Sequence, residues 1–252
     1  MSPTGIGFGV FVCTFGGVLL GMAVRRRLPE YHLDADSRDT VKLGVGLIAT
    51  MTALVLGLIT ATAKGTFDAT ETAVRHVAME TLTLDRVLAR YGPETREFRT
   101  ALRDSLARRV DATWPRDGSR PSAVDPWSGA ESAERLLDRI RALTPQTEAQ
   151  RQYRAQAVEL SESLLEFRWR SAGEASSIPV PFLAILVFWL AVTFTIFGIL
   201  APSNGTVYSI LLVCALSVSS AVFLVLEMDG PFDGLLRVSP DSLRYALEHI
   251  GR

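Results

Sequence analysis

Apolar residues in this chain gather in four long windows that are separated by polar stretches. The windows cover about residues 5–24, 41–63, 181–200 and 206–226. About 20 apolar residues in a helix, at 1.5 Å per residue, cross the roughly 30 Å hydrocarbon layer of a bilayer. No stretch alternates apolar and polar residues as a half-buried strand does. The pattern therefore predicts an all-α membrane protein with four transmembrane helices.

The region between the second and third windows has the pattern of a water-exposed helical bundle. Apolar residues over 67–88 repeat every seven positions, so the second membrane helix is predicted to continue to Arg90 as one rod. Gly92 and Pro93 are expected to end it. A second stripe over 153–167 has a matching spacing and is able to pair with the first, on a helix that Thr144 is predicted to cap.

These elements divide the chain into four parts. The first two membrane helices form a hairpin over 5–63, and a helical extramembrane domain follows over 64–177. The last two membrane helices form a second hairpin over 178–226. The tail over 227–252 carries a short amphipathic helix, with Ser239 and Pro240 at its predicted start.

The second window has two unlike faces. Large apolar residues fill one side of the helical wheel, whereas small and polar residues share an arc of roughly 120° on the other. A helix that touched only lipid would have no reason to be built this way. Two interpretations stay open: the small face packs closely against another helix, or it lines a water-filled path with a lysine at each mouth. The small face consists of Lys42, Gly46, Ala49, Thr50, Ala53, Gly57, Thr60, Ala61 and Lys64.

The first window carries a second ridge of small residues. Gly5, Gly9, Cys13, Gly17 and Gly21 recur every fourth position, which places them along one side of a helix. Small residues let two helix backbones approach closely in a membrane. This ridge is therefore able to dock against the ridge of the second window, which ends at Ala61.

Charge gives a prediction of sidedness but none of a nucleic-acid partner. The net charge of −1 over 252 residues provides no general attraction for polyanions. The short loop over 25–40 carries four arginines, and positively charged loops stay in the cytoplasm. The arginines therefore predict a cytoplasmic 25–40 loop, with both termini and the helical domain on the outside.

Few residues suggest chemistry at a reactive site. No nucleotide-binding loop, nucleophile elbow or spaced Cys/His set is present, so we expect no enzyme. Asp85 and Glu94 each lie near an arginine, and we interpret them as solvated or ion-paired. Glu227, Asp229 and Asp233 form an oxygen-rich turn of the kind that can bind calcium, although the spacing is not that of an EF-hand. The alternative is a helix end with solvated acids, and no other cofactor is expected.

Five stretches, in order, resemble a bacterial membrane family described as bestrophin-like. They are LPEYH, KLGVGLIATMTALVLGLITATAKGTFD, LDRVLARYGPE, IPVPF and LEMDGPFDGLLRVSP, and with their spacers they cover nearly the whole chain. The resemblance implies four spans, a helical domain between the second and third, and a homo-oligomeric anion channel whose second helix lines the pore. It places the protein in the bacterial inner membrane. It also implies a cytoplasmic helical domain, opposite to the arginine-based prediction.

We therefore expect a homo-oligomeric, anion-preferring ion channel whose partners are the lipid bilayer, inorganic ions and further copies of the chain. The alternative is a non-conducting scaffold or sensor whose 67–88 and 153–167 stripes bind a partner protein. The residues expected to line the conduction path are Lys42, Gly46, Ala49, Thr50, Ala53, Gly57, Thr60 and Lys64.

Overall fold

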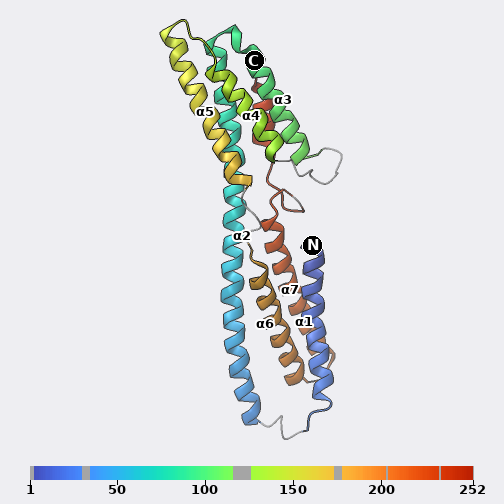
Figure 1. Ribbon diagram of the computed structural model, residues 1–252. Coiled ribbons are helices and arrows are strands. Elements are labelled where there is room, and N and C mark those ends of the chain that lie inside the picture. The colour runs from blue at the N-terminus through green and yellow to red at the C-terminus, as the bar shows by residue number, and fades with distance from the viewer. Residues whose placement is uncertain are drawn as a thin grey trace. The chain divides into compact units, whose positions relative to one another are not determined.

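A computed structural model describes residues 3–29, 35–115, 126–172, 178–202, 204–232 and 234–251 (Figure 1). Within these ranges every regular element is helical, which confirms the predicted fold class. The elements are α1 (Pro3–Arg25), α2 (Ala35–Tyr91), the 3₁₀ turn η2 (Pro93–Thr95), α3 (Arg96–Thr113), α4 (Pro126–Arg141), α5 (Glu148–Ala172), α6 (Val180–Leu200), α7 (Gly205–Asp229) and α8 (Asp241–His249).

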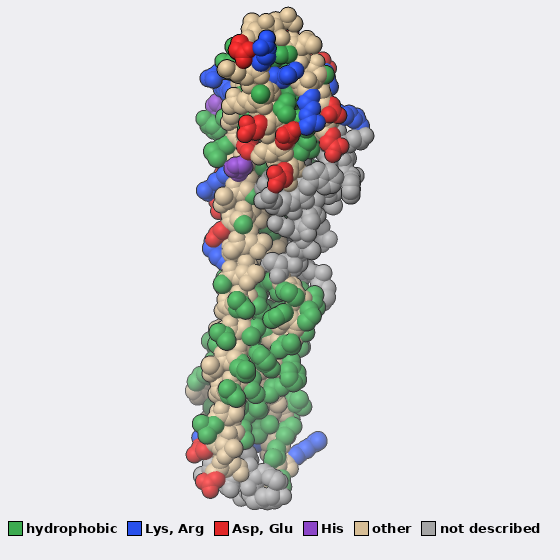
Figure 2. Space-filling model, turned by 60° about the vertical axis from the view of Figure 1, so that its left-hand side comes forward, with side chains coloured by type: hydrophobic (Ala, Val, Ile, Leu, Met, Phe, Trp, Pro, Cys, Tyr) green, Lys and Arg blue, Asp and Glu red, His purple; other side chains and the backbone are tan. Residues whose placement is uncertain are grey.

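The described helices include four that are long and apolar enough to cross a membrane: α1, α2, α6 and α7. The predicted spans are thus confirmed, and the chain is a multi-pass membrane protein with α3–α5 inserted between the second and third spans. Two compact units are present. Unit 1 comprises Met1–Phe67 and Ser176–Gly230, and unit 2 comprises Asp68–Ala175 and Pro231–Arg252. On the face that Figure 2 shows, hydrophobic side chains gather on unit 1, and charged side chains gather on unit 2 and at one end of unit 1.

In unit 1, α1 and α6 run in the same direction and approach each other closely (Figure 1). A Cβ added to Gly21 would lie 2.0 Å from the carbonyl oxygen of Thr195, and one added to Gly198 would lie 2.3 Å from that of Val18. Only glycine permits backbones to meet at such distances. The guanidinium of Arg25 also donates to the carbonyl oxygen of Ala201, just after the end of α6.

The α1 ridge could have docked on the ridge of α2, but its buried glycines, Gly17 and Gly21, meet α6 instead. Gly17 lies against the side chain of Thr195 and the backbone of Ala191. Both helices contribute small residues to this contact, so the backbones fit together there. The apolar core of unit 1 is completed by α2 and α7 through residues such as Ile59 and Val222.

Unit 2 begins within α2, which continues as one helix to Tyr91, as predicted. Gly92 has a φ of 148°, a conformation that side-chain-bearing residues rarely adopt, and it ends the helix there. The predicted pairing of the two apolar stripes is confirmed, because residues of both belong to one buried cluster. Leu84 and Leu88 are the residues of the α2 stripe in that cluster, and the residues of α5 are Tyr153, Ala157, Val158, Leu160 and Leu164.

Two helix starts differ from the prediction. The backbone N–H of Gln150 donates to Thr147 Oγ1 over 3.1 Å, so α5 is capped by Thr147 and not by Thr144. The chain before Glu148 is not helical, which leaves Thr144 too far from the first turn to cap it. Helix α8 begins at Asp241, one residue after Pro240.

The C-terminal tail packs onto unit 2. Leu243, Ala246 and Ile250 of this tail share a buried cluster with Leu106 and Trp114 of α3 and its end. The indole Nε1 of Trp114 also donates to the carbonyl oxygen of Val238 over 2.8 Å. The tail is therefore part of a compact unit and not a separate appendage.

Candidate functional site

Within unit 1, α2 presents three faces. The first is buried and holds Val45, Thr52, Ile59 and Ala63, which are spaced by seven, seven and four residues. This spacing keeps them on one side of a helix, and that side faces the core of unit 1. The core face is not the small face, which lies roughly 100° away around the helix axis.

The second face of α2 is exposed and made of large apolar residues. Its members are Leu43, Leu47, Met51, Leu54 and Leu58, of which Leu54 is 75% exposed. A continuous row of exposed large apolar residues, here four leucines and a methionine, is the expected surface of a helix that contacts lipid tails. This face therefore accounts for the contact of α2 with the bilayer.

The third face is the small face, and it too is exposed. Lys42, Gly46, Thr50, Ala53, Gly57, Thr60 and Lys64 are exposed and Ala49 is half-buried. Apart from the neighbouring backbone of α2 itself, no described atom lies within 4 Å of a Cβ built on Gly46 or Gly57. Packing inside one chain therefore does not account for this face. Two interpretations of the small face remain: it packs against another chain, or it lines a water-filled path.

The two threonine hydroxyls of the small face are bonded to their own helix. Thr50 Oγ1 donates to the carbonyl oxygen of Gly46 over 2.8 Å, and Thr60 Oγ1 donates to that of Leu56 over 2.7 Å. A hydroxyl whose hydrogen is used in this way offers only its lone pairs to other groups. Lone pairs do not attract anions, so any preference of this face for anions must come from its lysines.

The two lysines of the small face lie in different surroundings. Lys42 Nζ is 2.8 Å from Asp39 Oδ1, and both side chains are exposed. Lys64 Nζ lies 5.8 Å from the centre of the Phe67 ring. The carboxylate of Asp39 partly cancels the field of Lys42 at that end of the helix.

The residues expected to pack helices fall into two groups. Gly17 and Gly21 are buried against α6, whereas Gly5, Gly9 and Ala61 are exposed. In the described part of unit 1, nothing lies within 4 Å of a Cβ on Gly9.

The acidic turn at the end of α7 differs from the sequence expectation. Glu227 is buried rather than solvated, Asp229 is half-buried, and neither lacks a partner. Asp233 lies outside the described residues. The part of the chain that the structure describes contains no group of three His, Cys, Asp or Glu side chains placed to hold a metal ion.

The burial of Asp85 was not predicted from the sequence, which indicated only a solvated or ion-paired carboxylate. Asp85 is fully buried in unit 2, and its two oxygens accept hydrogen bonds from Arg99 Nε (2.7 Å) and Nη2 (3.0 Å). The backbone N–H of Gly251 donates to the same carboxylate over 3.3 Å. The pKa of Arg99 is raised above its ordinary value, chiefly by its hydrogen bond to Asp85. Asp85 directly follows Leu84, which belongs to the apolar stripe over 67–88. This position beside the stripe is the sequence feature that indicates burial.

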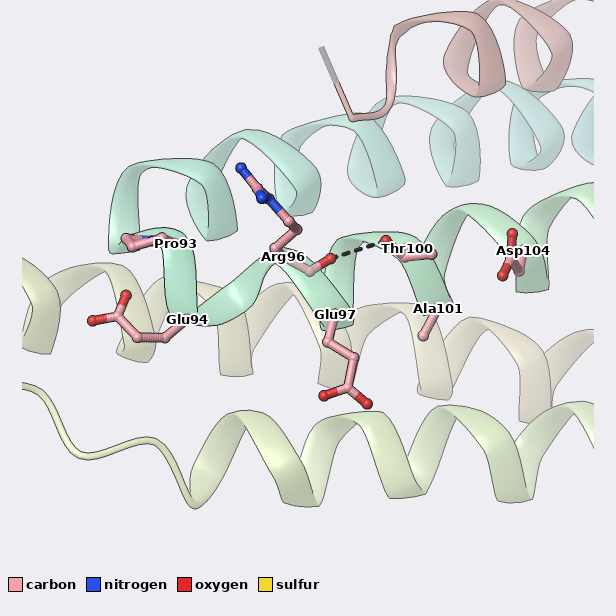
Figure 3. A pocket seen from close by; sticks show the side chains of 7 residues that line it. All are labelled: Pro93, Glu94, Arg96, Glu97, Thr100, Ala101 and Asp104. Carbon is pink, nitrogen blue, oxygen red and sulfur yellow. Dashed lines mark hydrogen bonds between the residues drawn. The ribbon is translucent and has the colours of Figure 1, made fainter.

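Glu94, by contrast, is exposed, as expected. It lines a shallow depression on η2 and α3 together with Glu97 and Asp104 (Figure 3). Glu97 is also 2.8 Å from Arg139 of α4. The three carboxylates do not converge on one point (Figure 3), and the residues that line the depression include no buried polar group.

The sequence comparisons agree with this architecture. Residues 12–243 match the sequence profile of the bestrophin-like domain, which is nearly the whole chain. Neither the curated proteins nor the solved structures contain a significant match.

Proposed function

The chain belongs to the bestrophin-like family, and on that premise we propose that it is a homo-oligomeric, anion-preferring ion channel whose α2 helices line the conduction path. The observation that carries the proposal is the exposed small face of α2. It is separate from the face that packs on the core and from the face of exposed leucines. Neither the core of unit 1 nor lipid explains such a face on a membrane helix. The face needs contact with another chain or with a water-filled path.

An oligomer follows from the position of this face. The small face lies on the outside of unit 1, so one chain cannot enclose a path along it. Copies arranged around a common axis would bring their small faces together, because closed rotational symmetry presents the same surface of each subunit to the axis. The glycines leave room for water and ions between the backbones.

Anion preference is proposed from the lysines at the two ends of the face. A ring of Lys64 side chains would raise the local concentration of anions at one mouth. A ring of Lys42 side chains would act in the same way at the other mouth, where Asp39 neutralises part of the charge. The short arginine-rich loop favours a cytoplasmic position for the Lys42 mouth, and we propose that orientation.

The test is ion flux through purified protein in liposomes, with chloride and potassium gradients measured separately. We expect the Lys42→Glu/Lys64→Glu variant to lose its chloride preference by about tenfold or more, because each mouth then attracts cations. The Asp39→Asn variant should shift selectivity further toward chloride, because it frees the charge of Lys42. High salt should weaken both effects by screening.

Arg26→Glu is the matched control. Arg26 is exposed just beyond the end of α1 and is not on α2, so reversing its charge should leave selectivity within about twofold. Flux that is absent from every folded, oligomeric sample would overturn the proposal in favour of a scaffold. Flux whose selectivity ignores the lysines would place the path elsewhere.

The structure weakens one argument for the scaffold alternative, namely that its apolar stripes are free to bind a partner protein. Its binding surfaces were the 67–88 and 153–167 stripes, but these stripes contain residues that pack against each other in unit 2. A partner could reach the buried residues of these stripes only by opening the bundle.

A further inference from the structure

The chain that follows α7 forms a closed loop whose base is tied to unit 2. The backbone N–H of Val238 donates to the carbonyl oxygen of Pro231 over 2.9 Å, which joins the two ends of the loop. Val238 is buried, and its carbonyl oxygen accepts the indole N–H of Trp114 over 2.8 Å. The ring of Phe232 meets the Trp114 ring edge-on, with 5.5 Å between the centroids. The loop is thus held by hydrogen bonds and by aromatic packing.

The tip of this loop, residues 234–237, is also ordered by its own contacts. Gly234 has a φ of 89°, which favours glycine at that position. Arg237 Nε donates to the carbonyl oxygen of Gly234 over 2.7 Å, which closes the turn. We call residues 234–237 the leucine tip.

The leucine tip turns its two apolar side chains outward. Leu235 is 82% exposed and Leu236 is 37% exposed, while Val238, two residues further on, is buried. Because the turn is closed and its base is anchored, these leucines cannot fold back onto the core without breaking the contacts that form the loop. An apolar pair held in this way is unfavourable in water and favourable wherever an apolar medium lies within reach.

The bilayer is the apolar medium that the chain itself brings near. Span α7 ends at Asp229, and Leu235 follows six residues later, so an extended connection reaches at most about 20 Å from the end of the span. A protein partner is a poorer match, because two leucines supply only a small part of the roughly 1,200 Å² that a stable interface buries. The membrane interface accepts a small apolar tip without a complementary surface.

We propose that the leucine tip inserts Leu235 and Leu236 into the interfacial region of the bilayer and so fixes the C-terminal part of unit 2 at the membrane surface. Arg237, which is exposed beside them, would remain among the phosphate groups. The driving force is apolar, so insertion does not require anionic lipids. The proposal depends on α7 being a membrane span and not on ion conduction.

The test uses the full chain in nanodiscs of phosphatidylcholine. In a Cys13→Ala/Cys214→Ala background, Leu235→Cys is labelled with an environment-sensitive nitrobenzoxadiazole dye, and phosphatidylcholine spin-labelled near the carbonyl is added as a quencher. We expect the fluorescence to fall at least twofold, and to fall equally when phosphatidylserine is included. The matched control is Thr100→Cys, an exposed position on α3, which should not be quenched by the lipid.

A second variant separates insertion from accidental proximity. Adding Leu236→Ser to the labelled protein should cut the lipid quenching at least twofold, because Leu236 is the leucine that remains in the tip once Leu235 carries the label. Circular dichroism should stay unchanged, since neither leucine is buried. Quenching of the Leu235 label by aqueous iodide as strong as that at Thr100, or shielding from both iodide and lipid, would overturn the proposal; the second result would indicate a protein contact.

Discussion

At the scale of single residues, the buried carboxylate of Asp85 shows how one charge is accommodated inside unit 2. Its oxygens receive a two-pronged hydrogen bond from Arg99 and a third from the backbone of Gly251. A buried ion pair adds little net stability when complete, but removal of one partner leaves a charge without compensation. The pair thus ties α2, α3 and the end of the tail to one another.

We expect Asp85→Ala to lower the free energy of unfolding by about 3–5 kcal/mol, because Arg99 would keep its charge without its partner. Thermal and denaturant unfolding of the purified protein measure the change. The control is Glu71→Gln, which removes the exposed pair of Glu71 with Arg75 on the same helix and should cost at most about 1 kcal/mol. Equal effects of the two substitutions would contradict the special role of Asp85.

At the scale of elements, the contact between α1 and α6 depends on a glycine from each helix. Gly21 of α1 lies against the backbone of α6, and Gly198 of α6 lies against the backbone of α1. Gly21 and Gly198 leave no space for a Cβ, whereas Gly16, on another side of α1, has none of the described atoms within 4 Å of its would-be Cβ. Gly21 and Gly16 both lie on α1, but only Gly21 is needed for close packing against α6. Only the position in the fold tells them apart.

Gly21→Ala should destabilise unit 1 by about 1–3 kcal/mol or separate α1 from α6, because the new methyl group would collide with the carbonyl oxygen of Thr195. Gly16→Ala makes the same chemical change at an open position and should be neutral or slightly stabilising. Melting temperatures of both variants in detergent give the comparison. A Gly16→Ala variant as unstable as Gly21→Ala would refute this account of the packing.

At the scale of the whole molecule, the exposed small face of α2 is the surface from which we propose assembly. Bulky residues on that face should keep copies apart, because the backbones could no longer approach. The core face of α2 and its exposed leucines would be unaffected. Assembly and folding can therefore be perturbed separately.

Gly57→Leu should convert the oligomer to smaller species in native mass spectrometry while leaving the helix content unchanged. Gly44→Leu is the matched control: Gly44 is an exposed glycine of α2 with an open Cβ position, but it lies about 140° away around the helix. It should assemble normally. Disruption by both variants, or by neither, would argue against assembly through the small face.

The four spans and the continuation of α2 as one helix to the end of its apolar stripe were predictable from sequence, because both are local properties. The start of α2 was not: it begins at Ala35, so residues 35–40, which were predicted to be part of the polar loop, are helical. Apolar windows report the length that crosses a bilayer, and no proline interrupts α2 between its ends. The division of α2 into a small and a large face could likewise be read from its periodicity. The apolar spacing of the two stripes also indicated that they could pair.

Only the tertiary structure decided which surfaces meet. The pattern on one helix shows that it has a small ridge but does not identify the helix it meets, so the docking of α1 on α6 could not be derived. Asp85 is paired with Arg99 from the next helix, and Trp114 binds Val238 more than a hundred residues away. Such contacts join residues that are distant in sequence. The energies of these contacts depend on the distances between residues in the folded chain. The pattern of residues along a single helix does not contain those distances.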